Sequence, residues 1–145
     1  FGDLYQSSDL TKINKSFINL VSKKRGSPKN IEDLIFSLKV VKHLKSNAVV
    51  LSKNKQTLGL GLGQTNRVDA LKSAIKNKKK YFGKSNFVCA TDGFFPFTDS
   101  IKILNKNRCG ILAQPSGSIN DNKIISYANN NKIALYFIKN RLFKH

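Results

Sequence analysis

Several residue types are scarce in this chain of 145 residues, and each scarcity excludes a class of protein. Methionine is absent and the chain begins with Phe1, so we expect it to be a piece of a longer protein. The two cysteines, Cys89 and Cys109, are too few for a disulfide framework and lack the spacing of a metal site. Each lies in a short apolar run, which favours buried reduced thiols in strands, with a disulfide left open.

Long hydrophobic runs and common catalytic signatures are also missing. No apolar run reaches the ~18 residues of a membrane-spanning helix, and no signal peptide opens the chain. No Ser/His/Asp set stands out, no carboxylate pair is spaced for acid–base work, and the zinc-deaminase signature is absent. The sequence therefore predicts a cytoplasmic protein with no membrane partner and no metal.

Acidic residues number only 8 against 26 Lys and Arg, which gives a net charge of +18. Such a chain is able to bind nucleic acid by neutralising phosphates, so a small basic RNA-binding module is the alternative function. However, only four of the basic residues are arginines, the lysines are scattered, and Lys, Asn and Ile share AT-rich codons. We therefore predict no nucleic-acid partner and interpret most of the charge as solvated surface.

Apolar residues recur at helix and strand periods from residue 27 onward, whereas the first 26 residues are polar and irregular. We interpret residues 1–26 as a connecting segment and residues 27–145 as a single domain. Helices are predicted at residues 28–45, 66–80, 99–107 and 120–130, and strands at 48–52, 56–62, 87–91, 109–113 and 133–138. This order predicts an α/β protein, a three-layer α/β/α domain whose mostly parallel sheet gains one antiparallel strand from the hairpin.

Four segments follow strands of this domain, at the sheet edge where α/β proteins bind ligands. In Thr57–Arg67, glycines and leucines alternate before a helix N-terminus, which suits either an anion or close packing of the strand on a helix. Three Phe and a Pro in Thr91–Asp99 suit either an aromatic clamp for a flat ring or a loop folded over the core. Residues 114–120 suit either ligand contacts or a turn that caps a helix. Residues 140–145 suit either ligand contacts or a fraying chain terminus.

Five motifs in order make the chain similar to the PurH family of bifunctional purine-biosynthesis enzymes. They are LKSNAVV at residues 44–50, GLGLGQTNRVD at 59–69, DGFFPFTD at 92–99, QPSGS at 114–118 and RLFKH at 141–145. The resemblance runs from about residue 4 to the end and matches the C-terminal part of the family's AICAR formyltransferase region. Two departures lie beside expected contacts: Thr65-Asn66 replaces a usual Met-Ser or Gln-Ser, and Gly93 replaces a usual Ala.

The resemblance implies a cytidine-deaminase-like subdomain without zinc. It also implies transfer of a formyl group from the co-substrate 10-formyltetrahydrofolate to AICAR ribonucleotide. In this family the active site lies between the two subunits of a homodimer, and a separate N-terminal domain is the IMP cyclohydrolase. Matching motif positions implies AICAR-nucleotide contacts for Asn47, Arg67, Phe94 and Arg141, and folate contacts for Val68, Asp99, Ser118 and Ile119.

The family's catalytic Lys-His pair lies upstream of the region that this chain matches. Lys42-His43 does not occupy that position and inherits no role. The resemblance therefore implies that the chain contributes binding residues and does not catalyse alone. A degraded relative that only folds is a further alternative, which failure of the complete protein to bind AICAR would favour.

Overall fold

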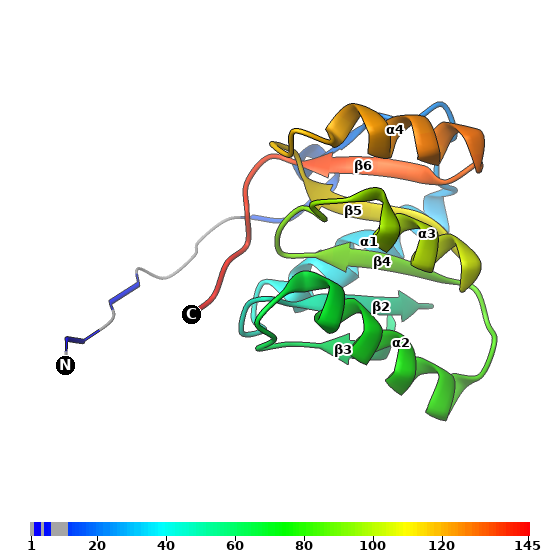
Figure 1. The fold of residues 1–145 in the computed structure, drawn as a ribbon. Helices are drawn as coiled ribbons and strands as arrows, with labels where there is room; N and C mark the ends of the chain where they lie inside the picture. The colour runs from blue at the N-terminus through cyan, green and yellow to red at the C-terminus, as the bar shows by residue number, and fades with distance from the viewer. Residues whose placement is uncertain (1, 4, 7–11) are drawn as a thin grey trace.

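The computed structural model describes residues 2–3, 5–6 and 12–145, and among them six strands form one sheet in the order β1-β6-β5-β4-β2-β3 (Figure 1). The strands are β1 (Ile18–Leu20), β2 (Val49–Lys53), β3 (Gln56–Gly61), β4 (Phe87–Thr91), β5 (Cys109–Pro115) and β6 (Ala134–Ile138). The helices are α1 (Pro28–Val41), α2 (Arg67–Phe82), α3 (Thr98–Lys106), α4 (Asp121–Asn130) and the short 3-10 helix η1 (Lys15–Phe17). The order of elements predicted from residue 27 onward is confirmed.

The strand directions differ from the predicted, mostly parallel sheet. β4, β5 and β6 are parallel, but β2 is antiparallel to both of its neighbours and β1 is antiparallel to β6. The sheet is therefore mixed, and the prediction of a mostly parallel sheet is wrong. The cause is that α1 returns the chain to the edge where β4 ends, so β2 begins there and runs against β4 (Figure 1).

The segment that we interpreted as a connector, residues 1–26, contributes to the sheet and the core. Residues 1, 4 and 7–11 lie outside the described residues. Further along, Ile13 and Phe17 are buried, and β1 extends the sheet beyond β6. The side chain of Ser22 then accepts a hydrogen bond from the N–H of Leu135, 2.7 Å away. A three-residue strand beside polar residues carries too little periodicity to be predicted from sequence.

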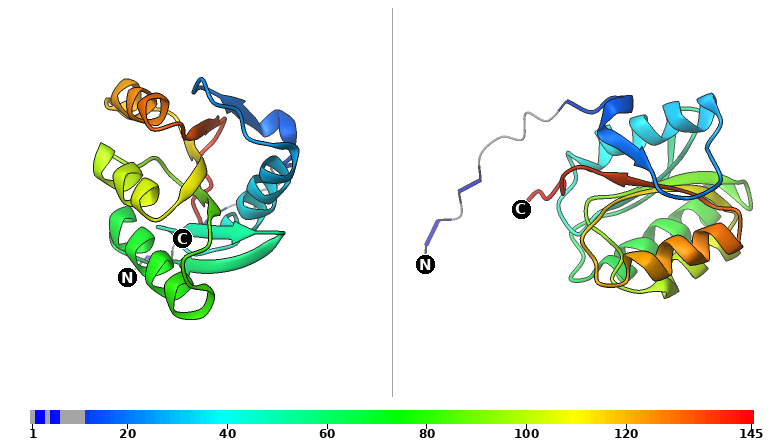
Figure 2. Two further views of the ribbon diagram at one scale, coloured as in Figure 1. Left: turned by 90° about the vertical axis from the view of Figure 1, so that its right-hand side faces the viewer. Right: turned by 90° about the horizontal axis from the view of Figure 1, so that it is seen from above.

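Helices cover both faces of the sheet. α1 lies on one face and α2, α3 and α4 lie on the other, so the predicted three-layer arrangement is confirmed (Figure 2). Alternate residues of the central strand β4 enter the two cores: Val88 and Ala90 pack with α1, whereas Phe87 and Cys89 pack on the opposite side. Burial on both faces explains why this strand reads as a continuous apolar run.

The helix ends follow from local hydrogen bonding. Ser27 caps α1 by accepting a hydrogen bond from the N–H of Asn30, and Asn66 caps α2 in the same way for Asp69. α1 ends at Val41, four residues before the predicted end, because the N–H groups of His43 and Leu44 bond to carbonyls three residues back. Within the described part of the chain, no helix is long and apolar enough to cross a membrane.

Candidate functional site

The C-terminal tail crosses the edge of the sheet where β4, β5 and β6 end and β2 begins (Figure 1). The N–H of Leu142, a buried residue, donates to the carbonyl of Asp92 at 3.0 Å. Ser46 binds Lys144 twice, through its N–H to the Lys144 carbonyl at 2.8 Å and through its hydroxyl, which accepts from the Lys144 N–H at 2.9 Å. Residues from both ends of the domain thus meet at one edge.

Gln6 ties the same tail to the beginning of the chain. Its side-chain amide donates to the carbonyl of Phe143 at 2.7 Å and accepts from the N–H of His145 at 3.0 Å. These bonds, together with the buried Leu142, hold the final residues in place, so the expectation of a fraying terminus does not apply to them.

Arg67, the first residue of α2, lies at the centre of this edge. Its Nη2 donates to Asn47 Oδ1 at 2.6 Å, and its Nη1 donates to the carbonyl of Phe94 at 3.0 Å. Both Nε and Nη2 donate to Asp92 Oδ1 at 3.2 Å. The structure therefore brings three of the sequence-predicted residues, Asn47, Arg67 and Phe94, into one hydrogen-bonded cluster.

The ion pair between Arg67 and Asp92 is largely buried, with exposed side-chain fractions of 12% and 0%. Burial lowers the pKa of the Arg67 guanidinium from its ordinary value, the charge and hydrogen bonds of Asp92 oppose that shift, and Arg141 adds to the lowering. An arginine stays charged under such conditions because its ordinary pKa is so high. The edge therefore contains one guanidinium that is held in place and whose positive charge is balanced by Asp92.

Arg141, the fourth predicted residue, comes from the tail and stacks on two aromatic rings. Its Cζ lies 4.8 Å from the centroid of Phe94 and 5.5 Å from that of Phe143. Phe143 also lies 5.7 Å from the Cζ of Arg67. A guanidinium over an aromatic ring is attracted to the face of the ring, and its N–H groups stay available to an anion or a polarised oxygen.

The glycine-rich strand has a packing role. A Cβ on Gly61 would lie 1.8 Å from the carbonyl oxygen of Ala70, and one on Gly59 would lie 2.1 Å from that of Ala74. Both carbonyls belong to α2, so these glycines let the helix lie directly on β3. Of the two interpretations of this segment, close packing on a helix accounts for Gly59 and Gly61, and this packing places Arg67 at the edge.

The four residues expected to contact folate come from the first turns of α2 and α3 and from the loop between β5 and α4. Val68 follows Arg67 on α2 and is half-buried, as is Ser118, whereas Ile119 is 98% exposed. Asp99 is exposed at the start of α3, where it pairs with Lys102 at 3.6 Å. Their roles stay predictions.

The loop that precedes α4 is stabilised from within. The N–H groups of Gly117 and Ser118 donate to the two carboxylate oxygens of Asp121, at 2.8 and 3.2 Å. Asn120 donates to the carbonyl of Pro96 at 2.7 Å and so joins this loop to the one after β4. Of the two interpretations of residues 114–120, the turn before a helix explains the bonding of these two N–H groups, because both donate to Asp121.

Sequence reasoning did not single out Asp92, Phe143 or Gln114. Asp92 was only part of a motif, and a carboxylate that is fully buried beside an arginine leaves no periodic signal. Three buried side-chain atoms have no hydrogen-bond partner among the described residues: Asp92 Oδ2, Gln114 Nε2 and Ser100 Oγ. No group of three or more His, Cys, Asp or Glu residues in the described part of the chain is arranged to hold a metal ion.

Comparison with known proteins gives the class of this α/β chain. The family model described as "AICARFT/IMPCHase bienzyme" matches residues 1–77. The chain is 46% identical over 147 aligned residues to the bifunctional purine biosynthesis protein PurH of Buchnera aphidicola subsp. Baizongia pistaciae, covering 100% of this chain and 28% of that protein. It is 44% identical to PurH of Caldicellulosiruptor saccharolyticus and 45% identical to PurH of Aquifex aeolicus, covering 99% of this chain and 28% of each.

The chain therefore belongs to the AICARFT/IMPCHase bienzyme family, the bifunctional enzymes of purine biosynthesis. It spans 28% of the length of these curated relatives. Among solved structures, it is similar to RibD of Acinetobacter baumannii, form 2, with a TM-score of 0.43 and 14% identity over 72% of this chain and 32% of that one.

Proposed function

We propose that this chain forms part of an AICAR formyltransferase site that transfers a formyl group from 10-formyltetrahydrofolate to AICAR ribonucleotide. The observation that carries the proposal is that Asn47, Arg67, Phe94 and Arg141 come from four separate segments and meet at one edge. These are the positions that the family motifs assign to AICAR. The finer fold assignment, a cytidine-deaminase-like subdomain without zinc, remains part of the proposal.

The chemistry of these side chains suits a flat, anionic ligand. Arg67 and Arg141 offer planar N–H groups to a phosphate or a polarised oxygen, and the Phe94 ring suits the imidazole of AICAR. Val68 and Asp99 begin helices and Ser118 and Ile119 follow β5, and all four are proposed to contact folate. Formyl transfer between two bound molecules gains most from orientation, so this chain would contribute positioning.

The remaining parts of the proposed site lie outside this chain. Proton transfer from the amine is assigned to the Lys-His pair upstream, and a second subunit would complete the site in a homodimer. The RNA-binding alternative has no support from the family assignment.

Arginine variants of the complete gene product test the proposal. Arg67→Ala or Arg141→Ala should lower kcat/KM for AICAR ribonucleotide roughly 10- to 100-fold, because each removes a charged side chain that would donate hydrogen bonds to the ligand. The measurement is formation of tetrahydrofolate with AICAR ribonucleotide and 10-formyltetrahydrofolate as substrates. Arg25→Ala is the matched control, because Arg25 is exposed and belongs to the segment between β1 and α1.

Three kinds of outcome would count against the proposal. An unchanged kcat/KM in the Arg141→Ala protein would remove Arg141 from the site, and the same result at Arg67 would remove Arg67. Absence of formyl transfer by the unaltered complete gene product would reject the function as a whole. Turnover by the 145-residue chain alone would contradict the assignment of catalysis to an upstream pair.

A further inference from the structure

A hollow of about 360 Å³ lies at the edge of the sheet opposite to the candidate site, where β2 ends and β4 and β5 begin (Figure 1). Its walls come from the start of α1, the end of β2 and the turn after it, and the starts of β4 and β5. Three cations are among the lining residues: Lys29, Lys53 and Arg108. None of the residues of the candidate site lines this hollow, so it is a separate feature of the fold.

The positive charges of these three side chains are not paired with carboxylates. In the described part of the chain, no ion pair involves Lys29, Lys53 or Arg108. The Nζ of Lys53 donates to the neutral Oδ1 of Asn86 at 2.6 Å, and Nη1 of Arg108 donates to the carbonyl of Lys84 at 3.3 Å. These bonds hold the two side chains at the hollow and leave their charges uncompensated.

One acidic side chain, that of Asp33, also lines the hollow. Its two carboxylate oxygens accept hydrogen bonds from the N–H groups of Asn54 and Lys55, at 2.9 and 2.8 Å, so it stabilises the turn between β2 and β3. Three cations therefore face one carboxylate, which leaves an excess of two positive charges. This excess matches a phosphate group, which carries about −1.5 to −2 charges at pH 7.

The placement of the cations raises the local positive potential further. Lys29 lies in the first turn of α1, which contains no acidic residue, so its charge adds to the positive end of the helix dipole. Burial lowers the pKa of the neighbouring Lys78, and the charges of Arg108 and Lys53 lower it further. An anion in the hollow would relieve the repulsion among these groups.

Gly110 leaves space in front of the cations. This exposed residue of β5 lines the hollow, and a Cβ built on it would meet nothing within 4 Å. The volume of the hollow falls in the range of small-molecule pockets, about 300–1,000 Å³. The space therefore suits a phosphate group together with the small molecule that carries it.

We propose that this hollow binds a small molecule through its phosphate group, with Lys29, Lys53 and Arg108 as the anion-binding residues. The planar guanidinium of Arg108 suits two phosphate oxygens, and the lysines act as point charges. The hollow is a second binding site, at the opposite edge of the sheet from the proposed formyltransferase site. Its existence does not depend on that proposed function.

Equilibrium dialysis of the complete gene product with labelled inorganic phosphate, at constant ionic strength, tests the proposal. Gly110→Leu fills the hollow and leaves every charge in place. Arg108→Gly removes the guanidinium, and glycine readily adopts the left-handed backbone of residue 108, whose φ is 70°. Lys76→Ala is the matched control, because it removes one positive charge from an exposed position on α2 outside the hollow.

Arg108→Gly and Gly110→Leu should each raise the Kd for phosphate roughly tenfold or more, because the first loses a charged donor and the second loses the space. Lys76→Ala should keep the original Kd, and so should Arg141→Ala at the other edge. An unchanged Kd in Gly110→Leu would overturn the inference, as would the absence of saturable binding by the unaltered protein. A loss confined to Arg141→Ala would assign the phosphate to the candidate site and would also overturn it.

Competition for the labelled phosphate identifies the source of the phosphate group. Ribose 5-phosphate or adenosine 5′-monophosphate should displace the label at a lower concentration than unlabelled phosphate if the ligand is a phosphorylated metabolite, and at an equal concentration if it is free phosphate. Failure of all three compounds to displace the label would contradict a phosphate site. Absence of formyl transfer by the complete gene product would reject the proposed function and leave this result unchanged.

Discussion

At the scale of single residues, the two arginines of the site differ in what surrounds them. Arg67 is largely buried and paired with Asp92, whereas Arg141 is exposed and stacks on Phe94 and Phe143. Family motifs identified both arginines, because short sequence patterns preserve residue type and order. They did not identify Asp92 or Phe143, because the roles of these residues depend on distances between segments that are far apart in sequence.

The cysteines allow a prediction that is independent of the function. Both thiols are free and buried, as predicted from the apolar runs, and burial raises the pKa of Cys109 from 9.0 to about 12. Below pH 9 the thiol is protonated in both the folded and unfolded chain. Above pH 9 only the unfolded chain loses the proton, so the free energy of unfolding should fall by up to about 1.4 kcal/mol per pH unit for this group.

Urea unfolding between about pH 8 and about pH 10.5 measures this slope. The Cys109→Ala protein should lose stability less steeply over that range, although its stability at neutral pH is lower because of the missing sulfur. An identical slope in the two proteins would show that Cys109 ionises equally in the folded and unfolded states. The pKa of Cys89 is raised by burial as well, so part of the decline should remain.

At the scale of elements, the packing of α2 on β3 positions Arg67 at the sheet edge. The alternation of glycine and leucine left two interpretations open, because a bare backbone face suits a ligand and a helix equally well. The spatial neighbour decides between them, and that neighbour is the backbone of α2 at Ala70 and Ala74. The mixed sheet was missed for a related reason: the directions of β1 and β2 depend on pairing partners.

Adding a methyl group to this contact should weaken the fold. Gly61→Ala or Gly59→Ala should lower the free energy of unfolding by about 1–3 kcal/mol, because α2 must move away from β3. Urea unfolding gives the value, and Gly110→Ala, with open space around its Cβ, should leave stability unchanged or slightly raised. Equal stability of the Gly61→Ala and Gly110→Ala proteins would contradict the close contact between β3 and α2.

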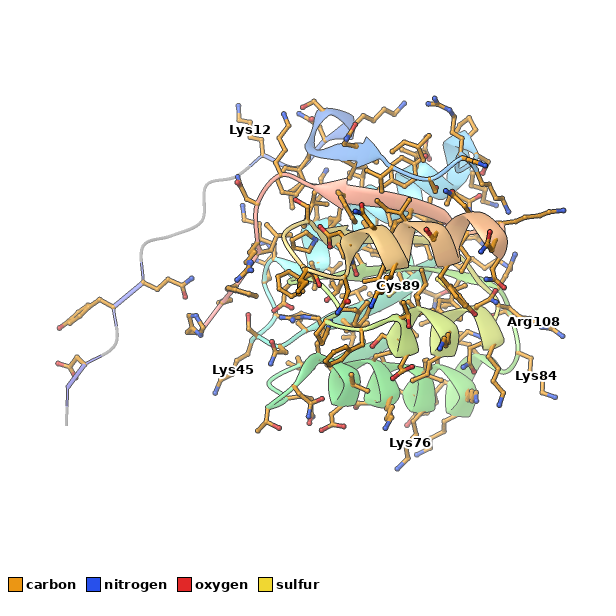
Figure 3. All side chains as sticks on the ribbon, turned by 45° about the horizontal axis from the view of Figure 1, so that its top comes forward. Lys12, Lys45, Lys76, Lys84, Cys89 and Arg108 are labelled. Atoms are coloured by element: carbon orange, nitrogen blue, oxygen red, sulfur yellow. The ribbon has the colours of Figure 1, made fainter. Side chains whose placement is uncertain are left out.

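At the scale of the whole molecule, positive charge dominates the surface. Lys12, Lys45 and Lys76 point outward from separate regions, Lys84 and Arg108 point outward side by side, and Cys89 lies inside (Figure 3). Five cations also line a hollow of about 420 Å³ near the ends of α2 and α3, opposite the candidate site: Lys78, Lys79, Lys84, Lys106 and Arg108. Cations near a helix C-terminus are stabilised by the helix dipole, which explains the lysines in the last turns of α2 and α3 without a ligand. Burial and the neighbouring cations Arg108, Lys53 and Lys79 lower the pKa of Lys78.

Self-repulsion from a net charge of +18 should make stability depend on salt. Raising NaCl from about 0.01 M to about 1 M shortens the screening length from ~30 to ~3 Å, so the melting temperature should rise. A gain of 1 kcal/mol corresponds to about 2–4 °C for a domain of this size. Calorimetric scans should show a smaller salt-induced rise in melting temperature for the double variant Lys84→Glu/Lys106→Glu than for the unaltered protein. An equal rise in the two proteins, or no rise in the unaltered protein, would mean that this repulsion is negligible.

We propose that the edge bearing Asn47, Arg67, Phe94 and Arg141 binds AICAR ribonucleotide. Calorimetric titration of the complete gene product with AICAR ribonucleotide, beside its Arg141→Ala variant, measures this directly. We expect saturable binding that the substitution weakens at least roughly tenfold, the loss that follows from removing a charged hydrogen-bond donor. No binding by the unaltered protein, or equal binding by the variant, would contradict it.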